Sequence, residues 1–163
     1  MKKLFLILLC ASAAPALAYD LNGVRLGGRE GEVRKLHPSV HCKPLEWKSN
    51  AADRRCDDAR VGLDGVPTRM TVFLKADVIQ AIELRFDTKD LDRVKAALRA
   101  RWGEPLGEAT ETISKKDKED RKVFKMRWEK GADRAILTGQ LEKKRAGLEI
   151  SRGNFPDEIY RVH

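Results

Sequence analysis

The chain has 163 residues, of which 42% are hydrophobic, and it carries 33 Lys and Arg against 25 Asp and Glu. A chain of this length buries about two thirds of its surface on folding, so it needs no metal to hold it together. Its length is that of one domain, and beyond the N-terminal apolar run no segment is apolar enough to span a bilayer.

The N-terminus has the pattern of a secretory signal peptide. Lys2 and Lys3 precede the apolar run Leu4–Leu9, and Ala16 and Ala18 form an A-x-A cleavage site. We therefore predict that residues 1–18, with Cys10, are removed after Ala18. The mature chain then has 163 − 18 = 145 residues and a net charge of 31 − 25 = +6. The short, Lys-led leader suggests a Gram-negative bacterium, and hence a periplasmic or secreted protein.

The first part of the mature chain is predicted to hold little regular structure. Leu21, Val24 and Leu26 indicate a short strand. Residues 29–36 indicate a short helix that places Val33 and Leu36 inward and ends before Pro38. The stretch 43–67 is polar and weakly periodic. Within it we expect only a short helix over 49–60, with Ser49 as its cap.

Two cysteines, Cys42 and Cys56, remain after cleavage, and in an exported chain they predict one disulfide bond. The alternative is a metal site made by these cysteines with His37, His41 and Asp57, whose ligand types suit zinc or copper. An oxidising compartment favours the bond between the sulfur atoms, so we predict a disulfide, no metal and no other cofactor.

The middle of the chain predicts a β-hairpin followed by a helix. Residues 70–75 and 78–86 flank the turn Ala76-Asp77, and in 78–86 the even positions are expected to face the core. A helix then follows, capped by Asp87 or Thr88 and ended by Gly103. Its apolar stripe consists of Leu91, Val94, Leu98 and Trp102.

The second half predicts an antiparallel meander. Residues 106–121 carry mixed charge and are expected to form a long loop or an extended hairpin arm. Three strands follow, with alternating inward side chains near 124–128, 135–141 and 146–150. The tail 154–163 is expected to dock on the body through Phe155, Ile159 and Tyr160.

Together these elements predict that residues 19–163 form a single α+β domain. We expect two layers, with helices on one face of an antiparallel sheet of about five strands. A short helix precedes the first strands and a longer helix the later ones. This order suggests a diverged helix-plus-strands repeat.

Two motifs resemble small secreted proteins of Gram-negative bacteria that are uncharacterised. GVRLGGREGEVRKL, residues 23–36, is similar to their G-x-x-LG opening, and residues 63–86 with VKAALRARWGEP are similar to their continuation, with the cysteine pair between. The helix-then-strands order also resembles, more distantly, the fold of the β-lactamase-inhibitory protein and of the small outer-membrane assembly lipoproteins. The resemblance implies a non-enzymatic binding protein.

No motif of a known catalytic class is present, which favours a protein that is not an enzyme. The alternative is a periplasmic enzyme or metal-binding protein that uses His37, His41, Cys42 and Cys56. Export, mixed charge and few aromatic residues argue against nucleic acid as a partner.

We therefore expect a binding module for an envelope component or a protein partner, in one version an inhibitor or immunity protein. The binding residues would be the outward cations of the meander and of its basic turn. These residues are Lys125, Arg127, Arg134, Lys143, Lys144 and Arg145. An acidic protein, lipopolysaccharide phosphates and anionic lipid all fit such a face, whereas the alternative is that these cations only keep the sheet soluble. The oligomeric state and the identity of the partner stay open.

Overall fold

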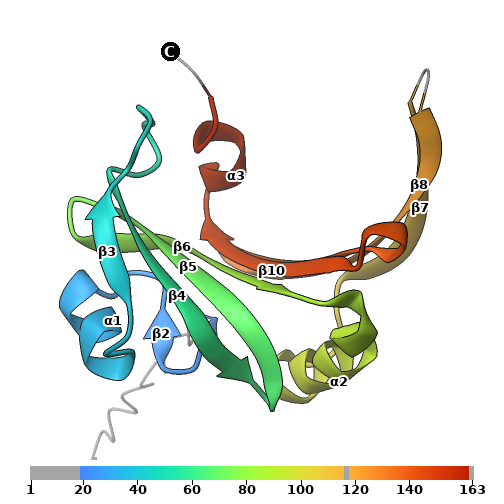
Figure 1. Ribbon diagram of the computed structural model, residues 1–163, viewed down its shortest axis with the longest axis horizontal. Coiled ribbons are helices and arrows are strands. Elements are labelled where there is room, and N and C mark those ends of the chain that lie inside the picture. Colours follow the sequence, from blue (N-terminus) through green and yellow to red (C-terminus); the bar gives the residue numbers. More distant parts are fainter. Residues whose placement is uncertain (1–18, 116–117, 162–163) are drawn as a thin grey trace, which may run out of the picture.

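The computed structural model describes residues 19–115 and 118–161 and contains one large antiparallel sheet (Figure 1). Eight strands lie in the order β3-β4-β5-β6-β10-β9-β8-β7, and β1 (Asp20–Leu21) and β2 (Val24–Arg25) form a separate pair. The predicted signal peptide, residues 1–18, lies outside the described residues.

The predicted fold class is wrong in its balance of elements. Strands make up 53% of the described chain and helices 21%, so the protein is mostly β and not a two-layer α+β fold with about five strands. Two segments account for the difference: the polar region before the central hairpin, which was expected to hold little regular structure, and the charged region after the longer helix, which was expected to be a long loop or an extended hairpin arm.

The first half of the sheet is a four-stranded meander. It consists of β3 (His41–Pro44), β4 (Arg54–Leu63), β5 (Val66–Lys75) and β6 (Val78–Phe86). The helix expected over 49–60 is absent, because β4 begins at Arg54 and pairs along β5. Sequence periodicity misses β4 because a register shift between Asp58 and Val61 breaks its alternation.

The central hairpin is confirmed, but its predicted facing is partly wrong. The turn residues Ala76 and Asp77 both have positive φ, the backbone that a tight two-residue hairpin turn requires. A register shift at Phe73/Leu74 reverses the alternation of β6, so Ile79 enters the core in place of Val78 and Gln80. Farther along, Ile82, Leu84 and Phe86 face the core as expected.

The second half is also a four-stranded meander, but its strands follow one another across the sheet in the opposite direction, from the far edge to the centre. Its strands are β7 (Gly107–Lys115), β8 (Lys118–Lys130), β9 (Asp133–Gln140) and β10 (Arg145–Arg152). The charged segment 106–121 is therefore an extended hairpin arm, the second of the two forms expected for it. The short helix η2 (Leu141–Lys143) makes the turn between β9 and β10.

Two helices and the small β1–β2 pair cover the convex face of the sheet (Figure 1). The helix α1 (Glu30–Leu36) buries Val33 but leaves Leu36 48% exposed, so the predicted inward position of Leu36 is wrong. Glu30 of α1 accepts a hydrogen bond of 2.8 Å from Arg54 of β4, and this guanidinium lowers the pKa of Glu30. The ion pair ties α1 to β4.

The longer helix α2 (Leu91–Trp102) has the predicted bounds and stops at Gly103, whose φ is +80°. Asp87 caps the short helix η1 (Thr88–Asp90), which precedes α2, and not α2 itself: its carboxylate accepts the N–H of Lys89 at 2.9 Å. The apolar stripe packs on β9, where Gly139 allows close approach: a Cβ at this position would lie 2.8 Å from the Leu91 side chain.

The C-terminal segment packs on the other, concave face. There α3 (Phe155–Glu158) buries Phe155 and Ile159 against Phe73 and Ala81. Tyr160 is 60% exposed and stacks on Trp47 with 5.6 Å between ring centroids. The predicted docking of this tail is confirmed, and it raises one wall above the concave face (Figure 1).

The predicted disulfide joins Cys42 and Cys56, which lie directly opposite each other on β3 and β4. Cys56 is fully buried. The bond holds the four-residue edge strand β3 to the rest of the sheet.

We expect that Cys42→Ser/Cys56→Ser lowers the free energy of unfolding by about 3 kcal/mol, because the bond closes a loop of about 15 residues in the unfolded chain. Urea unfolding followed by circular dichroism measures this difference. Reductant should destabilise the wild type by a similar amount and leave the variant unchanged. Equal stability of the two proteins in oxidising buffer would contradict the expectation.

Candidate functional site

The candidate site is the concave face of the sheet, where side chains from both halves meet. The strand register places one residue of each of β5, β6, β10, β9 and β8 in a single row across the sheet. In order, this row is Arg69, Arg85, Gly147, Thr138 and Lys125. Gly147 has no side chain, so the row has a gap at β10. The gap leaves a depression between Arg85 and Thr138.

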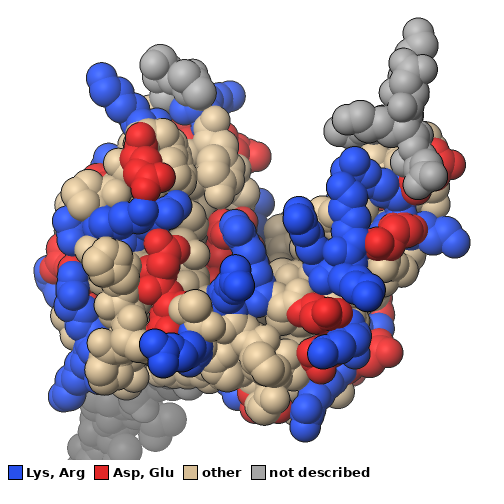
Figure 2. Space-filling view, viewed as in Figure 1, with Lys and Arg blue, Asp and Glu red and all other residues tan. Residues whose placement is uncertain are grey.

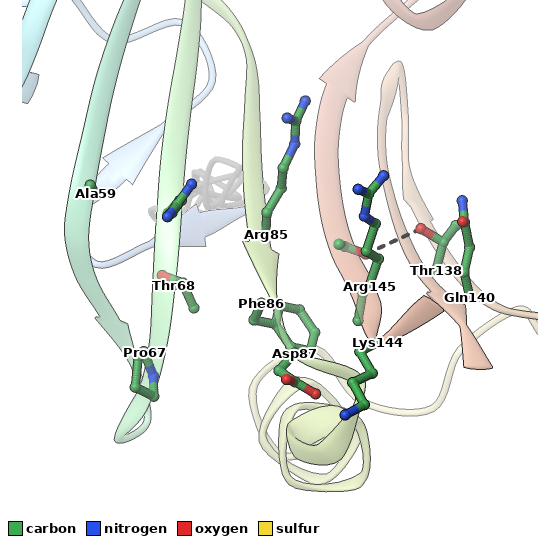
Figure 3. Close-up of a pocket in the computed structure, with 13 residues that line it drawn as sticks. Ala59, Pro67, Thr68, Arg85, Phe86, Asp87, Thr138, Gln140, Lys144 and Arg145 are labelled. Carbon is green, nitrogen blue, oxygen red and sulfur yellow. Dashed lines mark hydrogen bonds between the residues drawn. The ribbon is translucent and has the colours of Figure 1, made fainter. Parts of the chain in front are cut away.

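An open cavity of about 810 Å³ lies at this depression and extends to the start of α2. Four cations line it, Arg69, Arg85, Lys144 and Arg145, and Asp87 is its only carboxylate among the described residues. Figure 3 shows the side chains of Arg85 and Arg145 extending in the same direction from the neighbouring strands β6 and β10. We call this cavity, defined by its four cations, the cationic groove.

Three of these cations have no partner among the residues that the structure describes. Arg69, Lys144 and Arg145 are exposed, and none makes an ion pair or a side-chain hydrogen bond with another residue of the described chain. Arg85 contacts Glu83 at 3.1 Å but keeps 69% of its side chain exposed. Asp87 also caps η1 by accepting the Lys89 N–H at 2.9 Å, and its single carboxylate stands against four cations in the groove.

The arrangement of these cations lowers the stability of the fold. Arg69 and Arg85 are direct cross-strand partners on β5 and β6, and like charges in this position repel, where an opposite pair contributes about 0.2–1 kcal/mol. Lys144 has a left-handed backbone with φ +50°, which glycine adopts at lower cost.

Next to the groove lies a second like-charged pair. Glu83 of β6 and Glu149 of β10 are direct cross-strand partners, and they line a cavity of about 420 Å³ with Pro156 and Tyr160 from the C-terminal segment. Burial raises the pKa of the Glu149 carboxyl, and repulsion from Glu83 adds to the rise. A hydrogen bond of 3.0 Å from the Ser151 hydroxyl works in the other direction on the same pKa.

Of the predicted binding residues, only Lys144 and Arg145 line the groove. Lys125, Arg127 and Arg134 point to the same concave face, but each has a partner. Lys125 pairs with Glu111 at 2.9 Å, Arg127 pairs with Glu129, and Arg134 donates to the Gly153 carbonyl at 2.9 Å. Lys143, at the end of η2, is exposed and does not line the groove.

The sequence analysis did not identify Arg69 and Arg85 as site residues. Both alternate with buried residues, and Arg85 is readily assigned to the outer face of its strand. The missing information is the pairing of β6 with β10, which brings Arg85 beside the basic turn of the second half. Nothing in local periodicity specifies a contact between residues 60 positions apart.

The residues of the alternative metal site are not brought together. The two sulfurs are bonded to each other, and the potential metal ligand beside them is the Glu30 carboxylate, not a histidine. Within residues 19–115 and 118–161, this is the only group of three or more His, Cys, Asp or Glu side chains close enough to share a metal ion. His41 lies opposite Asp57 on the β3–β4 ladder, and Asp57 accepts the Thr71 hydroxyl at 2.8 Å.

The comparisons with known proteins give no relative: no family model, no curated protein and no solved structure matches this chain. In the part of the chain that the structure describes, no helix has the length and apolar character to cross a membrane. The geometry of the concave face is therefore the basis for a functional assignment.

The raised pKa of Glu149 predicts how a variant responds to pH. A folded-state pKa above the unfolded value means that ionised Glu149 destabilises the fold, and that this penalty disappears as the pH falls below the unfolded value. We expect Glu149→Gln to be more stable than the wild type at pH 7, with the difference closing toward acid pH. Thermal unfolding from pH 4 to 8 measures it. A difference that is constant with pH would contradict this origin.

Proposed function

We propose that this chain is an exported, non-enzymatic binding protein, and that the concave face of its sheet is the surface that contacts the partner. The disulfide supports export, because such bonds persist in oxidising compartments. The N-terminal pattern of residues 1–18 supports it independently. Localisation in the periplasm, or beyond it, is part of the proposal.

The observation that carries the proposal is the set of uncompensated cations in the cationic groove. Structural cations on the same face, such as Lys125 and Arg127, have carboxylate partners, whereas Arg69, Lys144 and Arg145 have none in the described chain. Sites where a sequence departs from what stability favours are commonly sites of function. Here a like-charged pair and a left-handed lysine lie in one groove, and a second like-charged pair, Glu83 and Glu149, lies beside it.

A solubilising role accounts for these cations less well. Residues that only keep a surface soluble need no particular position and are expected among opposite charges. The four cations of the groove instead line one cavity from β5, β6, the β9–β10 turn and β10. Figure 2 shows Lys and Arg side chains on both sides of the hollow that separates the two raised parts of the molecule.

The shape of the face favours a partner with a protruding surface. The sheet curves so that α3 stands on one side of the hollow and the β7–β8 arm on the other (Figure 1). In the narrower form of the proposal the protein is an inhibitor or immunity protein, and the partner is a secreted hydrolase whose surface enters this hollow. The distant fold resemblance suggested that form.

Affinity capture tests the proposal. Mature protein, residues 19–163, is immobilised and exposed to envelope extract of the source organism at low and moderate salt. We expect a specific protein that is retained by the wild type and lost, by about tenfold or more, with Lys144→Glu/Arg145→Glu, because charge reversal turns attraction into repulsion.

The matched control is Arg25→Glu/Lys35→Glu, which changes the net charge equally but on β2 and α1, on the opposite face. This variant should retain the captured protein. Capture that is absent with all three proteins, or equal with both variants, would contradict the concave face as the binding surface.

A further inference from the structure

We infer that the cationic groove binds an extended acidic segment of a partner protein, with carboxylates at alternate positions of that segment. The inference rests on the proposed function and specifies the chemistry of the same surface. It follows from the spacing of the groove cations, from the chemistry of guanidinium groups and from the recessed position of the groove.

One of the two cation spacings across the strands matches the repeat of alternate side chains in an extended peptide, and the other is shorter. Arg69 and Arg85 are direct partners on β5 and β6, which places their Cβ atoms about 5 Å apart. Arg85 and Arg145 are diagonal neighbours on β6 and β10, because Arg85 pairs with Gly147, and such neighbours lie about 7–8 Å apart. Alternate side chains of an extended chain point the same way and lie about 7 Å apart.

The direction of the bound segment follows from this arrangement. A row that crosses β5, β6 and β10 runs perpendicular to the strands, so the segment lies across the sheet and does not extend it as an added strand. The absence of a side chain at Gly147 leaves room for a backbone in the row between Arg85 and Thr138. Thr138 and Gln140 line the far side of the same cavity and offer hydrogen-bonding groups to it.

The groove cations have the chemistry that recognises carboxylates. Three of the four are arginines, whose planar guanidinium groups bind a carboxylate through two parallel hydrogen bonds. The arginines are not occupied by such a bond within the described chain, except for the single contact of Arg85 with Glu83. Arg69 and Arg145 can therefore each donate to one carboxylate of a partner, and Arg85, whose side chain is 69% exposed, can donate to a second carboxylate beside Glu83.

Two other occupants fit less well. A lipid surface is flat, whereas the groove cations line a cavity on a sheet that is flanked by α3 and the β7–β8 arm, and a bilayer would meet these raised parts first (Figure 1). A second copy of this chain carries the same net positive charge, about +6 after cleavage, and would be repelled. An acidic protein segment meets both constraints.

The experiment uses two blocked synthetic peptides of identical composition and the full mature chain. One alternates aspartate with threonine over eight residues, and the other has its aspartates in one block followed by its threonines. Binding is measured by fluorescence anisotropy at moderate salt. We expect the alternating peptide to bind several-fold more tightly, because only it presents all its carboxylates to one side when extended.

The decisive variant is Arg69→Glu, which places an acidic residue opposite Arg85. We expect it to weaken binding of the alternating peptide by about tenfold or more, since a charged hydrogen-bonded contact is replaced by repulsion. Its melting temperature should equal or exceed that of the wild type, because the like-charged pair becomes an opposite one. Loss of binding without loss of stability separates a binding role from a structural one. Lys35→Glu on α1 is the matched control and should bind normally.

Three results would overturn the inference: equal affinity for the two peptides, equal binding by wild type and Arg69→Glu, or binding to anionic phosphatidylglycerol vesicles that depends on Arg69 without binding of either peptide. The proposed function is judged separately by affinity capture. A captured protein that depends on Lys144 and Arg145, together with any of these peptide results, leaves the binding function standing and removes only the acidic-segment specificity.

Discussion

The pairing of β6 with β10 is the contact on which the rest of the structure depends. Each half of the molecule is a helix followed by a four-stranded meander, and the final strands of the two meanders lie side by side at the centre of the sheet. Six residue pairs, from Ala146↔Phe86 to Ser151↔Ala81, join them. On the convex face this joint makes one core continuous from α1 to α2. On the concave face it brings Arg85 beside the basic turn and Glu83 beside Glu149.

The sequence predicts local elements well where the apolar residues recur with one unbroken period. The helix at 91–102 has both a regular apolar stripe and a glycine stop, and its bounds are confirmed. The strand at 54–63 was missed because its alternation changes phase at a bulge and because four of its first five residues are charged. The cysteine pair was predicted because only two cysteines lie beyond residues 1–18. The order of the strands could not be predicted, since pairing between β6 and β10 leaves no periodic signal.

The difference between local patterns and strand pairing also explains which residues of the candidate site could be predicted. Lys144 and Arg145 form part of a visible basic cluster, so their sequence context alone identified them. Arg69 and Arg85 each look like an ordinary outward residue of a half-buried strand. Only the fold shows that they oppose each other, and that three groove cations lack the carboxylates that neutralise Lys125 and Arg127. A surface that is neutralised at one end of a sheet and uncompensated at its centre is well suited to recognise an anionic partner.

The joint between the two halves is tested most directly by backbone nuclear Overhauser effects in the isotope-labelled mature chain. The structure predicts cross-strand contacts between Leu84 and Leu148, between Arg85 and Gly147, and between Arg69 and Arg85. Observation of all three would establish the concave row that carries the cationic groove. A spectrum in which β6 contacts only β5, and β10 only β9, would separate the two halves and contradict both the continuous sheet and the binding surface built on it.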